Sequence, residues 1–169
     1  MAKYVVDAGP LIHLSQINHL KILQKLPSIV IPISVIQEIK HDTAQREIRT
    51  IGKWANTQII SPLTQQTSPA IISILRKYPL QKGEIDCIDL AVQMDPCVFL
   101  TDDLAARRAA EKLNVEVHGT VGLIAYAVRQ KWLSAEQARE ALDLLYHRSS
   151  LFITYALIEA AIRSLKNSH

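Results

Sequence analysis

The sequence contains few cysteines and few aromatic residues. Its two cysteines, Cys87 and Cys97, both lie in apolar stretches and lack the paired spacing of a zinc site. We therefore expect buried free thiols rather than a disulfide framework or a zinc centre. Aromatic residues make up 5% of the chain whereas aliphatic residues are abundant, which favours helices packed on an aliphatic sheet.

The sequence also lacks repeats, low-complexity tracts and long apolar runs. No apolar run approaches the ~20 residues that a membrane-spanning helix needs, so we expect a cytoplasmic protein without a membrane anchor. The net charge of +3 permits contact with nucleic acid without demonstrating it. A chain of 169 residues that is 49% hydrophobic can bury one sizeable core, and we expect one domain over residues 1–169.

Apolar segments and turn residues predict an alternation of strands and helices over residues 1–118. Helices are predicted between the strands, and the final third, residues 119–169, is expected to contain helices only. The fold class is therefore α/β with a helical C-terminal extension. The strands are expected at residues 3–6, 29–31, 59–60, 98–100 and 115–118.

Acidic residues directly follow two of these predicted strands. Asp7 ends the first, and Asp102 and Asp103 follow the apolar run that ends at Leu100 and Thr101. Because ligands bind outside the carboxyl ends of parallel strands, we expect these carboxylates to face one crevice. Converging carboxylates repel one another, so they shift their protonation or hold a divalent cation. Oxygen ligands favour Mg2+ or Mn2+.

Further acids, Glu38, Glu84 and Asp86, lie in the early turns of predicted helices. Any one of them taken alone is more often solvated surface than a functional group. The joint pattern favours a site, because the acids after the strands have no basic residue beside them in sequence except Lys3.

Four segments of the sequence resemble the PIN domain nucleases, in the same order and over nearly the full length. The third segment has the form Gly-Glu-x-Asp and the fourth the form Thr-Asp-Asp-x-x-x-Arg, and a Gly-Thr-Val-Gly-Leu stretch begins at Gly119. These features resemble the DUF3368 subgroup of PIN-like, often toxin-related, prokaryotic proteins. The four segments are Val5–Leu14, Ile31–Ile39, Gly83–Ala91 and Leu100–Ala110.

This resemblance implies a Rossmann-like, three-layer α/β/α sandwich around a parallel sheet. It also implies an acidic pocket with one or two Mg2+ or Mn2+ ions that cleaves RNA phosphodiesters. The first and second acids of the family fall on Asp7 and Glu38. The third falls best on Asp86, with Glu84 as a rival, and the fourth lies in the pair after Thr101.

We assign catalytic roles to five of these six acids, with Glu84 as the accessory one, and propose three of the five as inner metal ligands. A bound divalent ion activates water, and a second stabilises the leaving oxygen. The inner ligands are Asp7, Asp86 and Asp103, and the acids that orient waters are Glu38 and Asp102.

Several residues near these acids have two interpretations. Arg107 and Arg108 either contact a phosphate, or Arg107 pairs with Asp103 at helical spacing. Thr101 either hydrogen-bonds an acid or simply favours the strand, and substrate contact is a further role that we consider for it. His13 lies near Asp7, but a surface or internally satisfied histidine is the commoner case, and we assign it no role.

Aromatic and basic residues give weaker indications of nucleic-acid binding. Trp54 and Trp132 either stack on RNA bases, or close an edge of the core or an oligomer contact. Several basic side chains could form a phosphate track or ordinary helix surface. These side chains are Lys40, Arg46, Arg49, Lys53, Arg76, Lys77 and Lys82.

The function that the sequence favours is a metal-dependent endoribonuclease. The resemblance adds the toxin half of a toxin–antitoxin pair, an antitoxin protein as partner, and a homodimer. Two alternatives stay open, a non-catalytic PIN-like module that binds RNA or protein and a structure-specific DNA nuclease.

Overall fold

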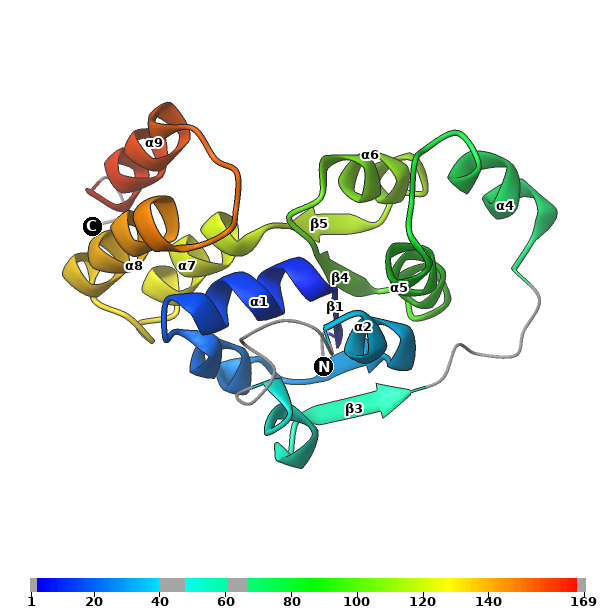
Figure 1. Ribbon diagram of the computed structural model, residues 1–169, viewed down its shortest axis with the longest axis horizontal. Helices are drawn as coiled ribbons and strands as arrows, with labels where there is room; N and C mark the ends of the chain where they lie inside the picture. Colours follow the sequence, from blue (N-terminus) through cyan, green and yellow to red (C-terminus); the bar gives the residue numbers. More distant parts are fainter. Residues whose placement is uncertain (1–2, 40–47, 61–66, 167–169) are drawn as a thin grey trace.

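The computed structural model describes residues 3–39, 48–60 and 67–166, which form a five-stranded parallel sheet with helices on both faces (Figure 1). The strand order is β3-β2-β1-β4-β5. The α/β/α sandwich expected from the sequence is therefore confirmed. The strands are β1 (Lys3–Val6), β2 (Ile29–Pro32), β3 (Thr57–Ile60), β4 (Cys97–Leu100) and β5 (Glu116–His118).

Helices connect the strands in the predicted alternation. α5 packs on β1, β2 and β4, and α6 packs on β5, whereas α1, α7 and α8 contact one another. In Figure 1 these two groups lie on opposite sides of the sheet. The connecting helices are α1 (Ala8–Gln16), α2 (Ile33–Glu38), α4 (Pro69–Leu75), α5 (Lys82–Gln93) and α6 (Leu104–Lys112).

The final third contains helices, as expected. α7 (Thr120–Arg129), α8 (Ala135–Arg148) and α9 (Tyr155–Lys166) pack against one another. Ser134 caps α8, and with Gln137 it forms a capping box, as their spacing in the sequence favours. The last apolar segment of the sequence begins at Phe152, but the helix begins only at Tyr155, so Phe152 precedes it.

The first helix is shorter than its apolar spacing suggests. α1 ends at Gln16, and a 3-10 helix, η1 (Leu20–Lys25), follows it; a second one, η3 (Ile51–Lys53), precedes β3. The break is at Asn18, whose φ of 57° is left-handed, and the next amide donates back to the carbonyl of Leu14. Asparagine tolerates this conformation at a helix end better than most residues, which explains why the helix stops here.

The core lies between the sheet and its helices. Val5, Val6, Phe99 and Leu100 on the two central strands are almost completely inaccessible to solvent. Both cysteines are buried free thiols, as predicted, and burial raises the pKa of each. No helix within the described ranges has the length and apolar character needed to span a bilayer.

The parallel register brings the ends of β1 and β4 together. Val6 pairs with Leu100, and the amide of Asp7 donates to the carbonyl of Leu100 at 3.0 Å. The chain order reverses between these two strands, since β1 leads to β2 on one side and β4 to β5 on the other. In open α/β sheets, ligands bind at this switch point, outside the carboxyl ends of the strands.

The two phenylalanines should differ sharply in their effect on stability. Phe99 is 0% exposed, whereas Phe152 is 97% exposed. We expect Phe99→Ala to lower the free energy of unfolding by about 3–5 kcal/mol through cavity formation. Phe152→Ala should change it by less than about 0.5 kcal/mol. Urea denaturation of both variants tests this, and a large loss in Phe152→Ala would show that this side chain is buried in solution.

Candidate metal-binding nuclease site

Asp7 stands where β1 ends and α1 begins, and it is 4% exposed. Its Oδ1 accepts from the amide of Ala8 at 2.8 Å, and its Oδ2 accepts from Thr101 Oγ1 at 2.8 Å. Burial raises the pKa of this carboxyl from 3.8 to about 6, against the lowering by these two hydrogen bonds. The negative charges of Glu38 and Asp103 raise it further.

Thr101 connects the ends of the two central strands. While its hydroxyl donates to Asp7, it accepts from the amide of Asp103 at 3.2 Å. Asp103 in turn caps α6, since its Oδ1 accepts from the amide of Ala106 at 2.7 Å. The predicted hydrogen bond of Thr101 to an acid is thus confirmed, and Thr101 links the side chain of Asp7 to the backbone of Asp103.

Glu38 reaches the same region from the last residue of α2. Its Oε1 accepts from the amide of Gly83, near the start of α5, at 2.8 Å. A Cβ on Gly83 would lie 2.6 Å from both carboxylate oxygens of Glu38, so only glycine allows this approach. Glycine at this position therefore holds the second acid of the site.

Glu84 completes the group from the first turn of α5. Its Oε2 accepts from the amide of Gln81 at 2.6 Å, as part of a capping box. Burial raises the pKa of Glu84 from 4.5 to about 7, and the charges of Asp103, Asp7 and Glu38 contribute to the rise. The pKa values of Glu84 and Asp7 are thus raised by the same two causes, burial first and the neighbouring carboxylates second.

The four acids line one cavity of about 270 Å³. They come from the N-terminal ends of α1, α5 and α6 and from the end of α2, and His13 and Asp102 share the lining. No lysine or arginine is among the described residues that line it. The partial positive charge of the helix N-termini compensates these carboxylates in part, and a phosphodiester would meet net repulsion here unless a cation were bound.

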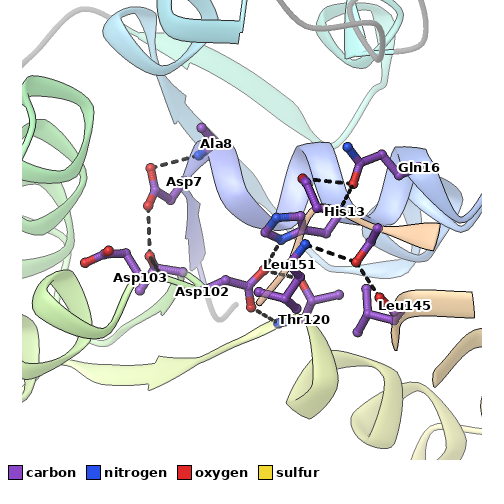
Figure 2. A network of polar contacts seen from close by, with 12 residues as sticks. Asp7, Ala8, His13, Gln16, Asp102, Asp103, Thr120, Leu145 and Leu151 are labelled. Atoms are coloured by element: carbon purple, nitrogen blue, oxygen red, sulfur yellow. Dashed lines mark hydrogen bonds and ion pairs between the residues drawn. The ribbon is translucent and has the colours of Figure 1, made fainter. Parts of the chain in front are cut away.

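Asp102 has a different environment from Asp103. It accepts from the amide of Thr120 at 2.7 Å and from the hydroxyl of Thr120 at 2.6 Å, and it shares a 2.7 Å hydrogen bond with Nδ1 of His13 (Figure 2). A Cβ on Gly119 would lie 2.8 Å from Asp102 Oδ1. Asp102 therefore caps the start of α7 and ties it to α1, and its catalytic role stays a prediction.

His13 is the internally satisfied histidine that the sequence favoured. Its side chain is 12% exposed, and it lies on α1 at the cavity wall. Its partner is 89 residues away in the chain. No local sequence pattern relates the two, so sequence reasoning missed this network.

Asp86 lies away from the residues that line the cavity. It is buried, it accepts from Ser34 Oγ at 2.6 Å, and Lys82 Nζ lies 2.9 Å from its Oδ2. Two residues along a helix separate side chains by about 200° around the axis, so Glu84 and Asp86 point in different directions. The structure brings Glu84, the rival candidate, to the other acids, and the metal-ligand role of Asp86 stays a prediction.

The basic side chains that the sequence suggested as phosphate contacts are not among the described residues that line the cavity. Arg107 donates to the carbonyl of Val117 at 3.2 Å and pairs with Glu111 at 4.0 Å, rather than with Asp103. Arg108 is exposed on α6, without a place in the cavity lining. Their substrate contacts, like that of Thr101, stay predictions. Lys40 and Arg46 lie outside the described residues, and the remaining basic side chains are exposed and do not line the cavity: Arg49, Lys53, Arg76, Lys77 and Lys82.

Both tryptophans are half-buried edges of the core. Trp54 packs on the hydrophobic core, and Trp132 packs edge-on against Tyr126 with ring centroids 5.5 Å apart. Neither lines the acidic cavity. The structure thus supports the core-edge interpretation for both.

The chemistry of the four acids suits a hard divalent cation. Each uses one oxygen on a backbone amide, and for Glu38, Glu84 and Asp103 the second oxygen has no hydrogen-bond partner among the described residues. In the described part of the chain, no three acidic, histidine or cysteine side chains already surround one point closely enough to hold an ion. Mg2+ keeps several waters and binds proteins through one or two carboxylates, so the free oxygens of Glu38, Glu84 and Asp103 are suitable ligands for it.

Family comparison agrees with this fold. The profile of the PIN domain family DUF3368 matches residues 3–167, so the chain belongs to this family. PIN domains are generally nucleases that use divalent metals. A search of curated proteins finds no significant match.

The stability of the protein should depend on pH through Asp7. A carboxyl whose pKa is raised by folding binds its proton more tightly in the native state, so stability falls as pH rises from about 4 to about 6 through the two pKa values of Asp7. We expect Asp7→Asn to remove this fall and to be at least as stable as wild type at pH 8, since asparagine also caps helices well. Melting temperatures from pH 4 to pH 8 give the difference between the two proteins.

Divalent cations should reverse this dependence in wild type. Cation binding requires the ionised carboxylates, so the increase in melting temperature with Mn2+ should grow as pH rises through about 6 to about 7, and Asp7→Asn should largely lose it. Glu140→Gln, which removes an exposed acid on α8, is the matched control. Identical Mn2+ responses in wild type and Asp7→Asn would contradict this site.

Asp102 should contribute to stability instead. Asp102→Ala leaves the first amide of α7 and His13 without their partner, and we expect a loss of about 2–4 kcal/mol in the free energy of unfolding. Chemical denaturation measures this loss. A change below about 0.5 kcal/mol would show that the Asp102 network does not tie α7 to α1.

Proposed function

We propose that this chain is a metal-dependent endoribonuclease that cleaves single-stranded RNA, with Mg2+ or Mn2+ held by the acids of the cavity. The observation that carries the proposal is the convergence of Asp7, Glu38, Glu84 and Asp103 from four separate elements on one cavity. Burial, together with their mutual repulsion, raises the pKa of Asp7 and Glu84. A structural network would pair such charges with basic residues, and none is among the described residues that line the cavity.

The residues of the chain have distinct tasks in this proposal. Asp7 and Asp103 are held side by side by Thr101, Glu38 by Gly83, and Glu84 by the amide of Gln81. These hydrogen bonds, together with those from the amides of Ala8 and Ala106 to Asp7 and Asp103, orient the carboxylates before any ligand arrives. This lowers the cost of ordering them on binding. A bound divalent ion would lower the pKa of water and neutralise charge on the phosphate.

Glu84 takes the third acidic position in this proposal, in place of Asp86. Glu84 lines the cavity, and the charges of three neighbouring acids act on it. Asp86 already has a cation in Lys82 and a donor in Ser34. An acid that is neutralised in this way gains less from a metal ion, because the ion would have to displace an existing partner.

The proposal is tested by Mn2+-dependent cleavage of a single-stranded RNA. We expect Asp7→Asn and Glu84→Gln to lose about 100-fold or more in rate. Mutation of residues that only hydrogen-bond a metal ligand already costs about 10- to 100-fold in activity, and direct ligands should matter more. Asp86→Asn should retain more activity than Glu84→Gln, and Glu140→Gln should equal wild type. Each variant is first shown to be folded by circular dichroism.

Equal rates in wild type and Asp7→Asn would contradict the proposal and favour the non-catalytic module. The same assay with a flap DNA in place of RNA separates ribonuclease from structure-specific DNA nuclease, and faster cleavage of the DNA would contradict the RNA assignment. Greater loss in Asp86→Asn than in Glu84→Gln would restore Asp86 as the third acid.

A toxin role and an antitoxin partner belong to the same proposal. An open acidic cavity that cleaves RNA without strong selectivity would require a partner that covers it in the cell. Induced expression should then arrest growth in wild type but not in Asp7→Asn. Growth that is equal in the two strains would contradict the toxin role without affecting the nuclease assignment.

A further inference from the structure

We propose that Phe152 is a base-stacking residue, which holds an unpaired base of single-stranded nucleic acid at the rim of the acidic cavity. The inference rests on the proposed nuclease function and specifies its substrate further. It concerns a side chain that neither the acid motifs nor the family match identifies. Sequence reasoning placed stacking on Trp54 and Trp132, which the fold uses in its core edge.

Phe152 is the most exposed large hydrophobic side chain among the described residues, at 97%. Single exposed apolar side chains are common, but one phenyl ring that is wholly in water, in a chain with two phenylalanines, gains nothing from folding. Its exposure therefore has no explanation in the stability of the fold. Its position gives one, because Phe152 lines the same cavity as Asp7 and Asp103.

The segment that carries Phe152 is fixed by hydrogen bonds. The amide and hydroxyl of Ser150 donate to Gln16 Oε1 of α1 at 2.8 and 3.1 Å, and the amide of Leu151 donates to Ser149 Oγ at 3.2 Å. Figure 2 shows this connection between α1 and the segment that follows α8. α1 also begins at Asp7, so one rigid helix positions both the acid and the aromatic side chain.

Leu151 and Phe152 are neighbours in sequence but differ in environment, one packed on the core and the other exposed. Leu151 packs against the hydrophobic core, which anchors the segment, and the next residue, Phe152, belongs to the lining of the cavity. The backbone of Phe152 is therefore fixed beside the cavity, and its ring is exposed to an incoming base. A fixed backbone lowers the cost of ordering this segment on binding.

The charges of the cavity favour a base as the occupant of this position. No lysine or arginine is among the described residues that line the cavity, so the bound cation is its only contact of positive charge for a phosphate within that part of the chain. A phenyl ring offers a neutral, apolar surface on which any base can stack, and stacking requires bases that are not paired in a duplex. The substrate is therefore single-stranded near the scissile phosphate.

Binding of a fluorescein-labelled single-stranded RNA, measured by anisotropy with Ca2+ in place of Mn2+, tests this inference. We expect Phe152→Ala to raise Kd about 5- to 100-fold, as loss of one stacked base does, and Phe152→Trp to bind at least as well as wild type. Duplex RNA of the same sequence should bind more weakly and should not respond to Phe152→Ala. Tyr155→Ala is the matched control, since Tyr155 is 55% exposed three residues further on but does not line the cavity.

A second measurement locates the stacked base. RNAs that carry a single 2-aminopurine at successive positions should show quenching at one position in wild type, and this quenching should disappear in Phe152→Ala. Sedimentation velocity of both proteins is run under the same conditions. A side chain that contacts a second copy of the chain would also be exposed in the isolated monomer, and this measurement detects such a dimer.

The possible outcomes separate the inference from the proposed function. Equal Kd values in wild type and Phe152→Ala, or an equal loss in Tyr155→Ala, would overturn the stacking role. A change from dimer to monomer in Phe152→Ala would overturn it in favour of a subunit contact. Binding that depends on Phe152 without any cleavage by wild type would confirm the stacking role and contradict the nuclease assignment.

Discussion

The parallel pairing of β1 with β4 is the constraint on which the site depends. It sets Val6 beside Leu100, so the residues that follow, Asp7 and Thr101, leave the sheet side by side. The hydroxyl of Thr101 then donates a hydrogen bond to Asp7 and accepts one from the amide of Asp103. One neutral side chain thereby holds two negative charges close together, where their repulsion would otherwise separate them.

The helix N-termini provide the compensation that makes this arrangement stable. Asp7 caps α1, Asp103 caps α6, Glu84 closes a capping box on α5, and Glu38 accepts from an amide of the same helix. Each carboxylate therefore contributes to the fold and keeps binding capacity for a ligand. The compensation is incomplete, because burial and the neighbouring negative charges still raise the pKa values of Asp7 and Glu84, and a bound cation would lower them. Asp102 differs from these acids, since its three hydrogen bonds tie α7 to α1, and its catalytic role stays a prediction.

Much of the architecture could be predicted because it depends on local patterns. Apolar runs marked the strands, Ser134 and Gln137 marked the start of α8, and the acids after two strands marked the edge of the sheet where the site lies. The end of α1 could not be predicted, because apolar spacing continues past Asn18 and the left-handed turn there depends on packing. The choice between Glu84 and Asp86 was equally inaccessible, since both are acids on one helix and only the orientation of α5 against α2 decides which one faces Glu38.

The sequence by itself determined the α/β fold class, the family and the set of acids from which the site is built, since these follow from residue type and spacing along the chain. The tertiary structure decided which acids meet, which of the adjacent pair Asp102 and Asp103 is already satisfied, and that Phe152 rather than a tryptophan stands at the cavity rim. These outcomes depend on helix rotation and on contacts between residues as far apart as Gln16 and Ser150 or His13 and Asp102. No short-range pattern encodes such contacts, because they arise from the packing of whole elements.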